Sequence, residues 1–263
     1  MIADSQGVKI GYEIKGEGEP LVLVHGLAYD RVGWGRLPEL LARHFSVLLV
    51  DNRGVGESDA PEGPYAVPQM AADVAAVLDD VGIERTNLFG VSLGGYIAQE
   101  FALAYPQRIQ KLVLVSTAPG GPKSHPMPAA GLEAFGKYPT MEREAGLRLM
   151  VENSLGARGV RDVPGLADEI FAYRLEHAPS LAAWQAQAYA GATFDAHDRI
   201  GAIATPTLVI QGGADNVVDP RNADLLADLI PNARVEIVAD RGHLLVWEDS
   251  ERVAELVREF LQS

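Results

Sequence analysis

Hydrophobic residues along the chain form two recurring patterns. Short apolar runs such as 21–24 and 47–50 are bounded by polar or turn residues, which is typical of strands buried on both faces of a sheet. Longer segments between such runs carry apolar residues at helical spacing, as in 70–81. Strands that alternate with helices of about 10–15 residues indicate βαβ units. The chain therefore predicts an α/β fold with a parallel sheet that helices flank on both faces.

The same patterns locate the individual elements. The turn Gly16-Glu17-Gly18 separates the first two strands and predicts a β-hairpin between them. The expected strands are 8–15, 20–24, 46–51, 87–91, 112–116, 207–211 and 234–238. The expected helices around this sheet are 35–45, 70–81, 93–105, 222–230 and 250–261.

One stretch, 118–203, interrupts the alternation. It has no clear strand pattern, and it shows helical patterns at 132–135, 143–153, 166–177 and 181–190. The alternation resumes at Pro206, and the sheet needs strands from both sides of the stretch. We therefore expect a core of residues 1–117 and 204–263 with a helical cap, 118–203, inserted into it.

The turn after the strand at 87–91 carries the first candidate for chemistry. Gly90-Val91-Ser92-Leu93-Gly94 lies between a predicted strand and a predicted helix, the context that a G-x-S-x-G nucleophile elbow requires. Small residues on either side of Ser92 let the neighbouring backbone pass closely. The alternative is an ordinary serine N-cap in a glycine-rich turn. The flanking strand and helix favour Ser92 as the nucleophile.

A serine needs a base and an orienting acid to react at neutral pH. Asp215 follows the strand at 207–211, and His243 lies between the strand at 234–238 and the last helix. The chain order Ser, Asp, His is that of α/β-hydrolases. Asp219 is an alternative acid, and Asp215 is also compatible with a plain turn residue. The histidines that compete with His243 are His25, His44, His125, His177 and His197.

His25-Gly26 follows the strand at 20–24 and suggests an oxyanion hole. The backbone N–H groups of Leu27 and Leu93 would bind the oxyanion, and a buried His25 would order the loop. A simple glycine turn is the alternative. The segment 51–58 is glycine-rich but lacks the complete phosphate-binding motifs, so we interpret it as a structural loop in which Arg53 forms a local ion pair.

Composition narrows the function classes. The 263 residues, 48% of them hydrophobic, suffice for a substantial core. The absence of cysteine excludes a cysteine nucleophile, a thiolate zinc site and a disulfide scaffold. A net charge of −14 argues against nucleic-acid and anionic-lipid partners. We see neither a secretory signal nor an apolar run of membrane-spanning length, so the default expectation is a cytoplasmic protein without a membrane partner.

The motifs together resemble the α/β-hydrolase superfamily from end to end. Within it, the segments 92–100 and 106–119 are similar to compact carboxylesterases and lactonases grouped around 3-oxoadipate enol-lactonase. The resemblance implies a mostly parallel eight-stranded sheet with helices on both sides and an inserted helical cap. It also implies cofactor-free and metal-free cleavage of a small-molecule ester or lactone, in which Ser92 is acylated, His243 is the base and Asp215 orients the imidazole.

The same triad is compatible with other reactions. A carbon–carbon bond hydrolase, a perhydrolase and an acyl homoserine lactone hydrolase stay open, as does a ligand-binding receptor on the hydrolase fold. Serine at the elbow argues against haloalkane dehalogenases and epoxide hydrolases, whose elbow carries aspartate. We expect a monomer or homodimer.

Substrate recognition is the least specified part of the sequence. We expect Trp34, Trp184, Tyr189 and Leu244 to contact substrate. The net negative charge favours neutral substrates. Arginines of the cap are alternatives for recognising a substrate carboxylate: Arg143, Arg148, Arg158, Arg161 and Arg174.

Overall fold

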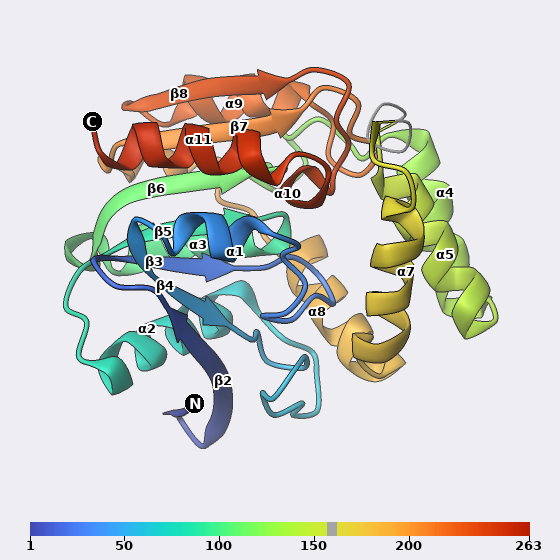
Figure 1. Cartoon of the computed structure of the whole chain (residues 1–263), viewed down its shortest axis with the longest axis horizontal. Coiled ribbons are helices and arrows are strands. Elements are labelled where there is room, and N and C mark those ends of the chain that lie inside the picture. The colour runs from blue at the N-terminus through green and yellow to red at the C-terminus, as the bar shows by residue number, and fades with distance from the viewer. Residues whose placement is uncertain (157–161) are drawn as a thin grey trace.

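A computed structural model describes residues 1–156 and 162–263, and its centre is one twisted eight-stranded sheet (Figure 1). The strand order is β1-β2-β4-β3-β5-β6-β7-β8. From β4 to β8 all neighbours are parallel, and only β1–β2 and β2–β4 are antiparallel. This confirms the expected fold class. The strands are β1 (Ile2–Ser5), β2 (Val8–Lys15), β3 (Glu19–Val24), β4 (Phe45–Val50), β5 (Thr86–Val91), β6 (Ile109–Val115), β7 (Thr207–Gly212) and β8 (Ala233–Val238).

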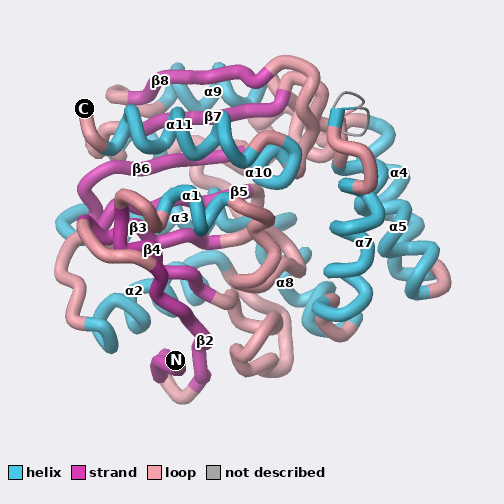
Figure 2. Tube along the Cα trace, viewed as in Figure 1, coloured by secondary structure: helices cyan, strands magenta, loops and turns pink. Residues whose placement is uncertain are grey.

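Helices cover both faces of the sheet, as Figure 2 shows. One hydrophobic cluster joins the sheet to α2 (Val67–Val81), α3 (Leu93–Ala104) and α9 (Arg221–Leu229). A second cluster joins the opposite face to α1 (Leu37–Leu41), α10 (Leu245–Glu248) and α11 (Ser250–Leu261). None of the helices in the described ranges combines the length and the apolar composition that a membrane crossing requires.

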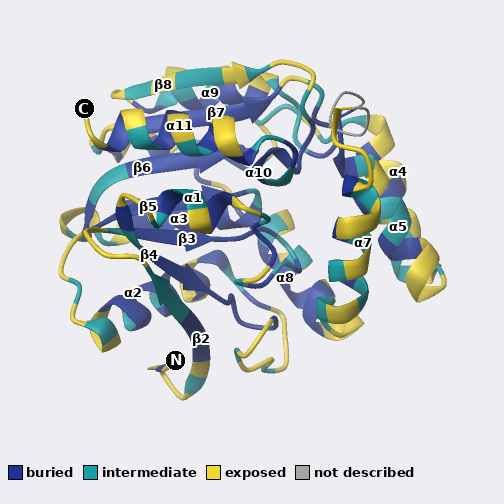
Figure 3. Ribbon diagram, in the orientation of Figure 1, coloured by how far each residue is buried: buried dark blue, intermediate teal, exposed yellow. Residues whose placement is uncertain are grey.

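Strand β3 shows why the central strands are uninterrupted apolar runs. Leu21 and Leu23 belong to one cluster, whereas Val22 and Val24 belong to the other. Because successive side chains of a strand point to opposite faces, a strand covered by helices on both sides must be apolar at every position. The dark blue central strands of Figure 3 show this burial.

The predicted hairpin between 8–15 and 20–24 is wrong. Strand β2 pairs with β1 and β4, while β3 lies between β4 and β5. The hairpin is instead β1–β2, and its turn holds Gln6 and Gly7 at positive φ. The chain crosses over after β2 because β3, which is buried on both faces, takes a central position. The predicted helix at 35–45 is also too long, since α1 ends at Leu41 and Phe45 opens β4.

The α-helices that the structure describes between β6 and β7 lie beyond the carboxyl ends of the strands (Figure 1), and we call them the cap helices. They are α4 (Ala129–Lys137), α5 (Arg143–Ser154), α7 (Leu166–His177) and α8 (Leu181–Thr193). In the described part of 118–203 no strand joins the sheet, although Gly120 and Asp195 form one isolated β-bridge. The boundaries of the cap, 118 and 203, stay a prediction.

Candidate active site

Ser92 lies in a strained turn between β5 and α3. Its backbone has φ 55° and ψ −118°, a conformation that non-glycine residues rarely adopt. The turn is tight enough to need glycine on both sides. A Cβ on Gly90 would lie 2.2 Å from the carbonyl oxygen of Gly94, and a Cβ on Gly94 would lie 2.0 Å from that of Val24. The small residues of the motif therefore let Ser92 stand at the carboxyl edge of the sheet.

The structure brings Ser92, His243 and Asp215 into one hydrogen-bonded chain. His243 Nε2 lies 3.0 Å from Ser92 Oγ, and His243 Nδ1 lies 2.9 Å from Asp215 Oδ2. Both distances are within hydrogen-bond range. The three residues come from turns after β5, β7 and β8, which end at the same edge of the sheet.

Asp215 is 3% exposed, and hydrogen bonds compensate its buried carboxylate. Oδ1 accepts from the N–H groups of Val217 and Val218 at 2.7 and 2.9 Å. Oδ2 accepts from Gln211 Nε2 at 2.9 Å in addition to facing His243. The alternative acid, Asp219, instead forms an ion pair with Arg221, which lowers the pKa of its carboxyl. The geometry therefore favours Asp215.

The backbone around His243 is anchored by two other elements. Ser154, at the end of α5, accepts hydrogen bonds from the N–H groups of His243 and Leu244 at 2.7 and 3.2 Å. Glu248 on α10 accepts from the N–H of Gly242 at 2.9 Å and from that of Gly156 at 3.2 Å. Burial raises the pKa of Glu248 to about 7, against the effect of these N–H groups. Neither contact follows from a sequence motif.

The predicted oxyanion-hole amides flank Ser92. Among the described residues, no acceptor bonds to the backbone N–H of Leu27 or of Leu93. Leu93 is the first residue of α3, where the helix dipole favours negative charge. Gly26 packs against the serine, since a Cβ placed on it would lie 3.0 Å from Ser92 Cβ. Both amides therefore have a free donor next to the proposed nucleophile.

His25 orders this loop as a neutral ring. Burial lowers the pKa of His25 to about 3. Its Nε2 donates to the carbonyl of Gly33 at 2.8 Å, so Nδ1 is left to accept from the N–H of Gly26 at 2.7 Å. The ring also stacks on Tyr29, with centroids 4.6 Å apart. His25 is therefore held by Gly33, Gly26 and Tyr29, and it lines the small cavity together with Ser92.

Two cavities meet at Ser92. A small one of about 60 Å³ lies on the side of His243, and a larger one of about 730 Å³ extends over Leu93 and Tyr96. Leu27 and Phe135 line both cavities together with Ser92. Such a divided site has room for the two halves of a substrate on either side of the serine.

The four residues expected to contact substrate divide into two pairs. Trp184 and Leu244 line the small cavity. Trp34 is 0% exposed, belongs to the core cluster under α1 and lines neither cavity, because its ring packs on His25 and Phe89. Tyr189 is 53% exposed and likewise lines neither cavity, since it lies on the outer side of α8. The structure therefore corrects the expectation for Trp34 and Tyr189.

Among the cap arginines that the structure describes, Arg174 reaches the site. It is 5% exposed, lines the small cavity and donates to the carbonyl of Ala28. Within the described ranges no carboxylate pairs with it, and its guanidinium has further donors. Arg143 and Arg148 are committed to surface contacts on α5 and α7. Arg158 and Arg161 lie outside the described residues.

Two further points concern ion pairs and metal sites. Arg53 forms the predicted ion pair, with Asp73 at 2.7 Å. No group of three or more His, Asp or Glu side chains among residues 1–156 and 162–263 is arranged to hold a metal ion.

Sequence reasoning missed Gln187, a buried polar residue on α8 that bonds to Ala28 and Arg53. Its only signal was a polar residue three positions after Trp184, on the same face of a helix.

Comparison with known proteins shows the family of the chain. The sequence profile of the α/β-hydrolase fold matches residues 19–250, and the chain belongs to this family. A 2-hydroxy-6-oxononadienedioate/2-hydroxy-6-oxononatrienedioate hydrolase of Burkholderia vietnamiensis is 34% identical over 100% of this chain and 94% of its own length.

Two solved structures resemble the fold closely. The enol-lactonase from Burkholderia xenovorans LB400 has a TM-score of 0.87 and 27% identity, with 100% of both chains covered. An esterase from Rhodococcus sp. ECU1013 has a TM-score of 0.89 and 27% identity over 100% of this chain and 98% of its own. The similarity to an enol-lactonase and to esterases confirms the resemblance drawn from the motifs.

Proposed function

We propose that the protein is a serine hydrolase that cleaves carboxylic esters or lactones of small to medium size through an acyl-enzyme on Ser92. The observation that carries the proposal is the hydrogen-bonded chain from Ser92 through His243 to Asp215. It supplies a nucleophile, a base within reach of its proton and an acid that orients the base.

Each step uses groups already described. Ser92 Oγ attacks the substrate carbonyl while His243 Nε2 takes its proton, and Asp215 stabilises the imidazolium. The amides of Leu27 and Leu93 donate to the oxyanion of the tetrahedral intermediate. His243 then protonates the leaving alkoxide, and a water activated by His243 releases the acid and restores Ser92.

A carbon–carbon bond hydrolase is the second candidate, and Arg174 favours it. Arg174 is a buried cation beside the small cavity, and no carboxylate in the described part of the chain pairs with it. Such a cation suits a substrate with an anionic group. The 34% identical relative from Burkholderia vietnamiensis is named for dioate substrates. This local charge outweighs the net charge of −14 as a guide to what enters the site.

A substrate panel tests these proposals. It contains p-nitrophenyl esters of increasing acyl length, γ- and δ-lactones, an acyl homoserine lactone and a 2-hydroxy-6-oxodienedioate. We expect ester or lactone turnover that falls about 10⁴-fold or more in Ser92→Ala. Faster cleavage of the dienedioate than of any ester would favour the second candidate. Tight binding with negligible turnover would favour a receptor, and a fully active Ser92→Ala would overturn the proposed nucleophile.

Two further predictions of the sequence accompany this function. We expect the enzyme to act in the cytoplasm on a small molecule, and to be a monomer or homodimer.

A further inference from the structure

Ala28, directly after the oxyanion-hole residue Leu27, has an unfavourable backbone conformation. Its φ is +64°, in the left-handed region that non-glycine residues rarely occupy. Such a conformation persists only where surrounding contacts hold it. The contacts of Ala28 and of the residues after it therefore hold the backbone next to the Leu27 amide.

Both polar groups of Ala28 bond to cap helices. Its N–H donates to Gln187 Oε1 of α8 at 2.8 Å, and its carbonyl accepts from Arg174 of α7. Gln187 also donates to the carbonyl of Arg53, so it is held from the opposite side. The strained residue is thus fixed by side chains that lie about 150 positions further along the chain.

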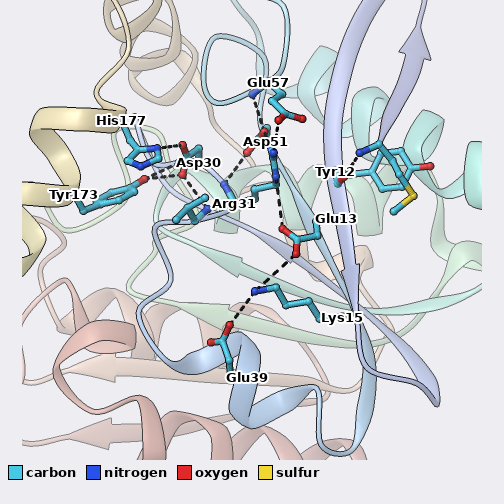
Figure 4. Close-up of polar contacts among 12 residues, drawn as sticks. Tyr12, Glu13, Lys15, Asp30, Arg31, Glu39, Asp51, Glu57, Tyr173 and His177 are labelled. Atoms are coloured by element: carbon cyan, nitrogen blue, oxygen red, sulfur yellow. Dashed lines mark hydrogen bonds and ion pairs between the residues drawn. The ribbon is translucent and has the colours of Figure 1, made fainter.

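Asp30 gives α7 a second hold on the same loop (Figure 4). It is 3% exposed, and its carboxylate faces Tyr173 Oη and His177 Nδ1, each at 2.9 Å. Tyr173 Oη also accepts from the N–H of Asp30 at 3.1 Å. Tyr173 and His177 are four residues apart, so one face of α7 presents both.

The body of the protein holds the next residue. The N–H of Arg31 donates to Asp51 Oδ1 at 2.7 Å, and the guanidinium of Arg31 pairs with Asp51 and Glu57. Figure 4 shows Asp30 facing α7 while Arg31 faces the opposite way, toward Asp51. Residues 28 and 30 therefore bond to the cap helices, whereas residue 31 bonds to the body of the protein.

We propose that Asp30, Tyr173 and His177 form a latch through which α7 positions the backbone amide of Leu27. The inference rests on the proposed function, because the Leu27 amide matters only if an oxyanion forms at Ser92. None of the three side chains touches the reacting atoms, and they are positioning residues. The cap helices thus contribute to the rate of the reaction as well as to the walls of the cavities.

The test removes the latch by mild substitutions. The double variant Tyr173→Phe/His177→Ala loses both side-chain donors to Asp30. In the Tyr173→Phe background, His177→Asn keeps an N–H near the position of Nδ1. The control is His197→Ala, which breaks a second His–Asp pair, with Asp198 at 3.0 Å, whose residues line neither cavity at Ser92.

Two readouts separate positioning from general damage. The first is amide hydrogen exchange of residues 25–33, which we expect to accelerate about tenfold in the double variant. The second is the affinity of a trifluoromethyl ketone, whose adduct on Ser92 places an oxyanion in the hole. The affinity for the ketone and kcat/KM per titrated site should both fall by about tenfold or more. Complete loss of one oxyanion donor lowers kcat by about 10²–10³-fold, and a displaced donor should lower it less. KM should change little, and His177→Asn should restore part of the loss.

Each outcome decides a separate point. Unchanged exchange of residues 25–33 would refute the latch. Faster exchange with wild-type affinity for the ketone would refute its role in positioning Leu27. Ser92→Ala, measured in parallel, tests the proposed function on its own. If that variant kept full turnover, the proposed function would fail while the exchange data still decided the latch.

Discussion

Ser92, Asp215 and His243 lie beyond the carboxyl ends of β5, β7 and β8. Hydrogen bonds and burial hold the backbone at these three positions. The cap helices instead reach the site with separate side chains, such as Arg174 of α7 and Gln187 of α8. The difference indicates a division of work. In the proposed function, the sheet edge carries the reacting groups, and the cap helices shape the cavities and hold the loop of the oxyanion hole. Changes at the sheet edge should therefore abolish turnover, whereas changes in the cap should alter its rate and selectivity.

After Ser92→Ala, the largest loss of activity is expected for Asp215→Asn. The substitution keeps the shape of the side chain but favours the wrong imidazole tautomer, so kcat should fall about 10³–10⁴-fold. The control is Asp219→Asn, which breaks the ion pair with Arg221 and should leave kcat within about twofold. Steady-state kinetics on one ester checks both. Equal losses in the two variants would contradict the assignment of the acid.

An intermediate effect is expected at Arg174, a buried cation of α7 that lines the small cavity. Arg174→Gln should lower the ratio of kcat/KM for an ester with a second carboxylate to kcat/KM for a neutral ester, by about 10–100-fold. That range corresponds to one charged hydrogen bond. Using the ratio cancels any loss that arises from the contact with Ala28. Arg148→Gln, on the surface of α5, is the control. An unchanged ratio would exclude Arg174 from recognition of an anionic group.

The predicted triad at the sheet edge rests on local sequence signals. Ser92 and Asp215 follow from local signals, because each lies in a turn soon after a buried strand, β5 or β7. His243 lies in the loop after the partly exposed strand β8. Parallel strands bring such turns together whatever the rest of the chain does. The family and the fold class could therefore be predicted from one sequence, and both are confirmed.

Non-local choices were harder to predict. The antiparallel pairing of β2 with β4 depends on which strand takes the central place, and the turn at Gly16–Gly18 gave no hint of it. Trp34 looked like a cavity wall but packs under His25, and Tyr189 faces solvent because α8 turns its other side inward. The contacts of Asp30 with α7 require the docked position of a helix that lies more than a hundred residues away. Docking of this kind leaves no periodic signal in a sequence.

The smallest expected effect concerns stability at the contact between α5 and the His243 loop. The pKa of Glu248 is about 7 when folded, above its ordinary value of 4.5, so the folded state binds the proton more tightly. The stability from this group is present below pH 4.5 and is lost as pH rises to 7. Glu248→Gln does not titrate, and it keeps an acceptor for Gly242 and Gly156.

The free energy of unfolding of Glu248→Gln relative to wild type should therefore rise from about pH 5 to about pH 8. The expected gain is on the order of 2–3 kcal/mol, since one pKa unit corresponds to about 1.4 kcal/mol. Denaturant titrations at the two pH values measure it, with the exposed Glu133→Gln as the control. An equal difference from wild type at both pH values would contradict the raised pKa.

The central claim is that Ser92 at the sheet edge is acylated during turnover. Intact-protein mass spectrometry after rapid acid quench, with a p-nitrophenyl ester as substrate, tests it most directly. We predict a mass increase equal to one acyl group, located on the peptide that contains Ser92 and absent from Ser92→Ala. An acyl group on another residue, or turnover of the ester in Ser92→Ala at the wild-type rate, would contradict the account.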